Sequence, residues 1–62
     1  MTRIAPVTGL DLLSTIDKMR EQGASYYDIC KETGYVEDNG PRAGKVDSSG
    51  FMLAVYDAYA LL

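Results

Sequence analysis

Apolar residues recur at steps of three and four near the start of the chain, with polar residues at the positions between them. This spacing predicts a helix with one buried face at about residues 9–22. Four residues form its apolar stripe: Leu12, Leu13, Ile16 and Met19. Thr8 and Asp11 have the spacing of a capping box, and Gly23 suits the left-handed position that ends a helix.

A shorter second helix is predicted at residues 26–33. Ser25 and Asp28 repeat the capping pattern, and Gly34 ends the segment. Ile29 is its inward-facing residue. The stretch at 35–46 contains an Asn-Gly-Pro turn signal and two glycines, which predicts an irregular loop.

The third predicted helix, at residues 48–61, begins after Asp47, a suitable cap. Between Phe51 and Leu62 the only charged residue is Asp57. A helix with one buried face needs an apolar stripe of about 100°, yet this helix is apolar nearly all round. We expect one face to pack on the first two helices, and the others to find no cover within so short a chain.

The sequence thus predicts an all-α fold, a single compact three-helix domain over residues 1–62 that is completed by dimerisation or by a partner helix. The predicted core anchors come from all three helices: Leu12, Leu13, Ile16, Ile29, Phe51, Val55 and Leu62. The other apolar positions of the last helix form the predicted partner interface: Met52, Leu53, Tyr56, Tyr59 and Leu61. Exposed apolar patches mark contact sites, and tyrosines are enriched in them.

Length and composition strengthen the expectation of a partner. For 62 residues, apolar burial contributes on the order of 90 kcal/mol, and ordering the chain costs on the order of 90 kcal/mol. A lone monomer is therefore marginal, and such small domains usually rely on disulfides, a metal or another chain. One cysteine excludes an internal disulfide, and the absence of histidine argues against a zinc site, so we expect no cofactor.

Charge, hydropathy and cysteine content limit the cellular location and the kinds of partner that the sequence allows. A net charge of -3 has the wrong sign for a strong nucleic-acid binder. No apolar run approaches the roughly 18 residues of a membrane span, and residues 1–6 lack the apolar region of a secretory signal. With Cys30 as a single free thiol, the predicted location is the reducing cytoplasm.

Catalytic chemistry finds little support in the sequence. Without histidine, histidine acid–base catalysis and Ser-His or Cys-His nucleophiles are excluded. Asp11 and Asp28 occupy predicted cap positions, and a lone helical cysteine such as Cys30 is more often a small buried apolar residue than a reactive thiol. The glycines do not have the spacing of a phosphate-binding loop. We predict no enzyme and no small-molecule substrate.

Direct nucleic-acid binding is the rival hypothesis. The short helix ending at Gly34 resembles the first helix of a helix-turn-helix unit. The basic recognition helix of such a unit should follow within about four residues, but an acidic, glycine-rich stretch follows instead. Lys31, Arg42 and Lys45 are the candidate phosphate contacts, and about three such contacts give weak, salt-sensitive attachment.

Several short motifs occur in a recognisable order: Val7-Thr8-Gly9, Leu12-Leu13, Gly34-Tyr35-Val36, Val46 and Phe51-x-x-Ala54 to Ala58. Their order resembles the N-terminal region of the cyanobacterial AbrB-like transcriptional regulators, where an L-T-G-x-x-L-L helix precedes a C-G-Y-V turn and an F-Y-E-A-L-L-E-A helix. The similarity covers residues 7–58. Thr33 stands where the family has cysteine, and Leu53 where it has glutamate, which makes the last helix more apolar than in the family.

The resemblance implies a module of transcription regulation. Members of the family carry a later, basic, β-rich segment that contacts DNA, whereas this sequence stops at Leu62. The resulting hypothesis is a non-enzymatic interaction module that homodimerises or docks on a transcriptional regulator through its last helix. Two alternatives stay open: a small DNA-binding regulator of helix-turn-helix-like type, and an accessory or viral inhibitor that mimics the assembly domain of a regulator.

Overall fold

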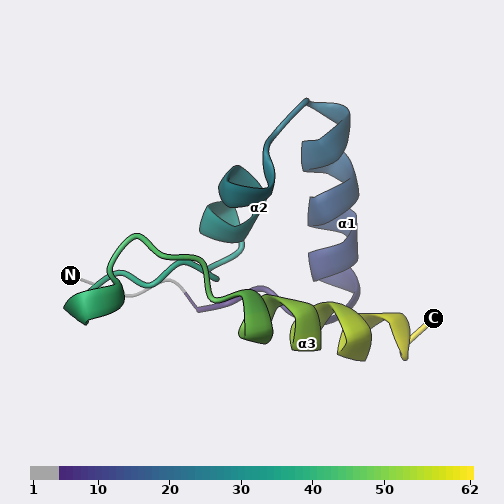
Figure 1. Ribbon diagram of the computed structural model, residues 1–62. Helices are drawn as coiled ribbons and strands as arrows, with labels where there is room; N and C mark the ends of the chain where they lie inside the picture. Colours follow the sequence, from purple (N-terminus) through teal and green to yellow (C-terminus); the bar gives the residue numbers. More distant parts are fainter. Residues whose placement is uncertain (1–4) are drawn as a thin grey trace.

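The computed structural model describes residues 5–62 (Figure 1). Its elements, in chain order, are α1 (Gly9–Glu21), α2 (Tyr26–Glu32), the 3-10 helix η1 (Gly40–Arg42) and α3 (Ser48–Tyr59). The predicted compact all-α fold with three α-helices is confirmed, and no strand forms within the described range. Each predicted helix starts where the observed one starts and runs one or two residues too far, into the turn that ends it.

None of the helices between residues 5 and 62 combines the length and the apolarity needed to cross a membrane. Residues 1–6, for which we expect no secretory signal, lie mostly outside the described residues.

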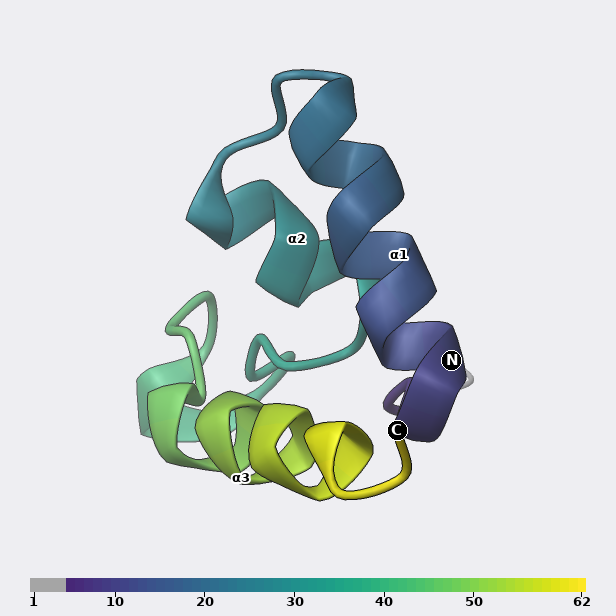
Figure 2. The ribbon, with the colours of Figure 1, turned by 90° about the vertical axis from the view of Figure 1, so that its right-hand side faces the viewer.

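Helices α1 and α3 diverge from a shared end, as the two arms of a V (Figure 2). The start of α1 lies beside the end of α3, where a Cβ placed on Gly9 would stand 3.6 Å from Cδ1 of Leu61. Helix α2 lies on the open side of the V (Figure 2). Most contacts between helices join α1 to α3, so the angle between these two determines the shape of the molecule.

The core sits where the three helices and the segment after α2 meet. Its buried residues are Leu12, Ile29, Cys30, Tyr35 and Phe51. Among the other predicted core anchors, Leu13, Ile16 and Val55 are partly buried.

The prediction of Leu62 as a core residue is wrong, because 81% of its surface is exposed. Helix α3 ends at Tyr59, and the backbone N–H of Leu62 donates to the Tyr59 carbonyl in the turn that follows, at 3.1 Å. Residue 62 therefore no longer follows the helical stripe that buries Phe51 and Ala58.

Local sequence explains most helix ends. Helix α1 ends at Glu21, and Gly23 (φ +80) closes the turn after it: its N–H donates to the Arg20 carbonyl, and the N–H of Ala24 donates to the Met19 carbonyl. This pair of bonds is a Schellman motif, which requires the left-handed glycine. At the start of α2 the predicted capping box forms: Asp28 N–H donates to Ser25 Oγ at 3.2 Å, and Ser25 N–H donates to Asp28 Oδ2 at 3.3 Å.

Of the other two predicted helix caps, the one at α3 forms and the one at α1 does not. Asp47 caps α3, since its Oδ1 accepts from the Gly50 N–H at 3.1 Å. The predicted capping box of Thr8 and Asp11 is wrong, because the Thr8 side chain makes no capping hydrogen bond. Gly9, the next residue, has a φ of +66. This left-handed first residue turns the chain away from the path that would bring the Thr8 hydroxyl to the amides of the first turn.

Helix α2 ends in a second Schellman motif, and the residues that follow it join distant parts of the chain. We define the junction cluster as Val7, Thr33, Gly34, Tyr35 and Phe51. Val7 N–H donates to the Thr33 carbonyl at 2.9 Å, and the Tyr35 hydroxyl donates to the Val7 carbonyl at 2.7 Å. The Thr33 hydroxyl, fully buried, donates to the Ile29 carbonyl at 2.7 Å. Every buried side-chain nitrogen or oxygen of this cluster that the structure describes has a hydrogen-bond partner.

The predicted loop at 35–46 is more ordered than the sequence indicates. Val36 and Val46 form an isolated antiparallel bridge. Glu37 N–H donates to the Lys45 carbonyl at 2.9 Å, and Gly44 N–H donates to the Glu37 carbonyl at 2.8 Å. The chain therefore leaves α2, turns through η1 and returns along itself to start α3, which fixes where α3 begins.

Candidate functional site

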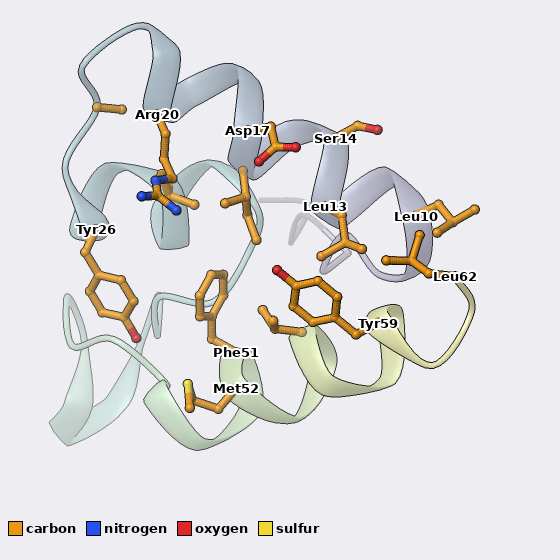
Figure 3. A pocket seen from close by; sticks show the side chains of 14 residues that line it. Leu10, Leu13, Ser14, Asp17, Arg20, Tyr26, Phe51, Met52, Tyr59 and Leu62 are labelled. Atoms are coloured by element: carbon orange, nitrogen blue, oxygen red, sulfur yellow. The ribbon is translucent and has the colours of Figure 1, made fainter.

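An open groove with a volume of about 740 Å³ lies between α1 and α3 (Figure 3). Cavities of about 300–1,000 Å³ with mostly apolar walls are typical of binding sites. Helix α1 supplies one wall, α3 the other, and Ile29 of α2 lies between them. The groove follows from the V of the two long helices, because α2 is too short to fill the space that they enclose.

The α1 wall combines apolar and polar residues. Leu10, Leu13 and Ile16 line the groove, and so do Ser14, Asp17 and Arg20. Steps of three and four place Leu10, Leu13, Asp17 and Arg20 on one side of the helix. In Figure 3, Leu10 and Leu13 lie near the closed end of the V, and Arg20 lies toward its open end with its guanidinium directed into the groove.

Phe51 anchors the α3 wall. Its ring makes edge-to-face contacts with Tyr26, at a centroid distance of 5.5 Å, and with Tyr35, at 5.4 Å. Such aromatic pairs each contribute about 0.5–1.5 kcal/mol beyond area burial. The start of α3 is therefore held firmly against α2 and the junction cluster. Farther along α3, Met52 and Tyr59 also line the groove, but they stay 48% and 58% exposed.

All five predicted interface residues are exposed, but they do not form one face. Met52 and Tyr59 line the groove, whereas Leu53 and Tyr56 lie outside it and are 64% and 65% exposed. We call Leu53 and Tyr56, together with the neighbouring Asp57, the outer face of α3. Leu61 lies near Gly9 at the closed end of the V. The last helix therefore has two apolar surfaces, one inside the groove and one outside it.

The sequence interpretation missed the α1 wall of the groove. Leu10 is 49% exposed and Tyr26 is 51% exposed, and both line the groove. Leu10 stands three residues before Leu13, so a stripe wider than the core stripe was visible in the sequence. Its use as a wall depends on the angle between α1 and α3, which periodicity does not give.

The candidate phosphate contacts lie away from the groove. Lys31, Arg42 and Lys45 are all exposed. Arg42 lines a smaller pocket of about 180 Å³ together with the acidic residues Glu37 and Asp47. These two acidic neighbours offset the charge that Arg42 would offer to a phosphate.

Cys30 is fully buried in the core. Burial raises the pKa of its thiol, and a hydrogen bond with Tyr26 offsets this only in part. The thiol is therefore neutral at pH 7, whereas nucleophilic attack requires the thiolate. Among residues 5–62, no three His, Cys, Asp or Glu side chains lie close enough together to hold a metal ion.

Comparison with known proteins adds no relative: no family model, no curated protein and no solved structure matches the chain. The function must therefore be argued from the groove and the exposed surface of α3.

Proposed function

We propose that the protein is a non-enzymatic interaction module that binds a helical partner, either a second copy or a regulatory protein. The partner lies in the groove between α1 and α3 and covers the exposed side of α3. The observation that carries this proposal is the apolar groove of about 740 Å³ beside four large α3 side chains that are about half exposed or more: Met52, Leu53, Tyr56 and Tyr59.

The groove suits an amphipathic helix better than an extended peptide. In helix-in-groove recognition, apolar anchors at helical spacing enter an apolar channel. An extended peptide instead needs a free strand edge to pair with, and within the described residues the backbone forms only the isolated bridge of Val36 and Val46. Tyrosine and methionine are enriched at protein interfaces, whereas charged residues are depleted in their cores. The α3 wall, with Met52 and Tyr59, has this composition.

We further propose that the module acts in the regulation of transcription. The support is the resemblance of its ordered motifs to the N-terminal region of AbrB-like regulators. In this proposal the effect on transcription passes through the partner, since the acidic neighbours Glu37 and Asp47 weaken the case for Arg42 as a phosphate contact. A net charge of -3 points the same way.

Transcript levels in the source cell test this proposal without assuming the partner. We expect deletion of the gene to change a defined set of transcripts, and the variant Tyr56→Glu to reproduce that change. Tyr56 is 65% exposed, so its replacement should remove a partner contact and leave the fold intact. Tyr27→Glu is the matched control: Tyr27 is also an exposed tyrosine, 42% exposed, but it lies outside the groove. This control should leave the transcripts as in the wild type.

The rival, direct DNA binding, predicts the reverse pattern. Replacement of Lys31, Arg42 and Lys45 by alanine would then reproduce the deletion, and Tyr56→Glu would not. That result, or a deletion without effect on any transcript, would contradict the proposal. Binding to duplex DNA that falls steeply with salt would favour the rival as well, since each phosphate contact releases counterions.

A further inference from the structure

We infer that the occupant of the groove is α3 of a second copy of this chain, in a two-fold dimer where each copy inserts the outer face of α3 into the groove of the other. This inference rests on the proposed function, which requires only that the groove binds some helical partner.

The exposed area matches what one side of a stable dimer buries. Seven large apolar residues that line the groove or belong to the outer face of α3 are about half exposed or more: Leu10, Tyr26, Met52, Leu53, Tyr56, Tyr59 and Leu62. At about 200 Å² for a fully exposed large side chain, they present roughly 800 Å² together, the area that each partner buries in a standard interface.

The groove and the outer face of α3 are arranged so that each copy can cover both surfaces of the other. A two-fold interface uses the same patch on both subunits, so the patch must be complementary to itself. Here the groove lacks a helix to fill it, and the outer face of α3 lacks a surface to cover it. Both features belong to the same helix: Met52 and Tyr59 line the groove, and Tyr56 stands between them in sequence on the neighbouring side. A reciprocal exchange therefore covers both surfaces at once.

Charge complementarity supports the same pairing. Asp57 is the only charged residue of α3 and belongs to its outer face. Arg20, which shares its wall with Asp17, is the only cation that lines the groove between residues 5 and 62, and its guanidinium is directed into the groove (Figure 3). We expect Asp57 to come opposite Arg20 when the outer face of one copy enters the groove of the other.

Sedimentation equilibrium over a range of concentrations tests the dimer. The wild type should be a dimer with a micromolar dissociation constant. Leu10→Glu, in the groove wall, and Tyr56→Glu, on the outer face, should each raise that constant by about 30-fold or more, since truncating or charging an interface tyrosine costs about 2 kcal/mol. Tyr27→Glu, outside the groove, should leave it unchanged. Circular dichroism confirms that each variant is folded.

Charge reversal tests the orientation. Arg20→Glu and Asp57→Lys should each weaken the dimer by about fivefold, because partly exposed ion pairs contribute about 0.2–1 kcal/mol and reversal adds repulsion. The double variant should recover the wild-type constant to within about twofold. A loss in both single variants that the double variant does not recover would contradict the opposition of Asp57 and Arg20, and with it the insertion of the outer face.

The outcome separates this inference from the proposed function. A wild-type chain that stays monomeric at the highest soluble concentration overturns the dimer. The proposed function still stands in that case if Tyr56→Glu reproduces the transcript changes of the deletion, because the occupant is then a different protein. A dimer that persists in both Leu10→Glu and Tyr56→Glu also overturns the inference, since a different surface then joins the copies.

Discussion

The junction cluster and the groove share Phe51 but differ in what covers their side chains. In the junction cluster, Tyr35 is 7% exposed, and its hydroxyl donates to the Val7 carbonyl from 28 residues away in sequence. In the groove, Met52 and Tyr59 are about half exposed although they are as apolar as the core. The junction cluster finds its partners within the chain. The groove does not, and this difference is the reason for assigning the function to the groove.

The largest effect on the junction cluster should come from Gly34→Ala. Gly34 has a φ of +89, and a Cβ there would stand 2.9 Å from the Cα of Pro6, a backbone atom that cannot move aside cheaply. We expect a loss of about 3 kcal/mol, combining about 1–2 kcal/mol for the left-handed conformation with the cost of the clash. Thermal or urea unfolding followed by circular dichroism measures it.

Gly23→Ala is the control for this substitution. Gly23 ends α1 with a similar φ of +80, but a Cβ there would meet no atom within 4 Å. The loss should be only about 1–2 kcal/mol, the conformational part alone. Equal losses at Gly23 and Gly34 would show that the Pro6 backbone moves aside without cost, which would contradict a rigid junction.

The exposed side of α3 should behave differently, because its contribution depends on protein concentration. Leu53→Glu combined with Tyr56→Glu should leave the melting temperature unchanged in dilute solution. At a concentration about tenfold above the dissociation constant, the variant should lose about 1.4 kcal/mol relative to the wild type, the stabilisation that binding provides. A fall of equal size at every concentration would show that the two residues stabilise the monomer instead.

The residues before α1 and α2, Thr8 and Ser25, allow a comparison of helix caps in which smaller changes in stability are expected. Ser25→Ala removes the hydroxyl that accepts from the Asp28 N–H and should cost about 1 kcal/mol. Thr8→Ala should cost less than about 0.5 kcal/mol, because the Thr8 side chain makes no capping bond. Chemical denaturation of both variants checks this, and a larger loss at Thr8 would contradict the effect of Gly9 on the start of α1.

The smallest expected effect is a dependence of stability on pH. Burial raises the pKa of Cys30 above its ordinary value of about 8.5. The unfolded chain therefore releases this proton at a lower pH than the folded one. The contribution of Cys30 to stability is complete below about pH 8.5 and is lost as pH rises through the folded pKa. Melting temperatures from pH 7 to 10 should fall less steeply in Cys30→Ala than in the wild type, and equal slopes would contradict the assignment.

Sequence reasoning succeeded where the cause is local. The start of each helix, the glycine that ends α1 and the caps at Ser25 and Asp47 follow from residues within one turn. It failed where the cause is distant or conformational. The bond between Tyr35 and Val7 joins segments that no periodicity connects, and the left-handed Gly9 removes the cap expected at Thr8.

The candidate site was only partly visible in the sequence. The excess of apolar residues on the last helix predicted Met52, Leu53, Tyr56, Tyr59 and Leu61 as interface residues, and all five are exposed. Their division between a groove and an outer face could not be predicted, because it depends on the angle at which α1 crosses α3. For the same reason Leu10 and Arg20 were not identified as a wall of the groove.

The central claim is that a second copy of the chain covers the groove and the exposed side of α3, while the junction cluster is complete without it. A dilution series of the wild type, followed residue by residue by nuclear magnetic resonance, tests this most directly. The account predicts that signals of Leu10, Tyr56 and Tyr59 shift with concentration while those of Thr33 and Tyr35 stay fixed. Signals that do not move at any concentration, or that move at the junction cluster instead, would contradict it.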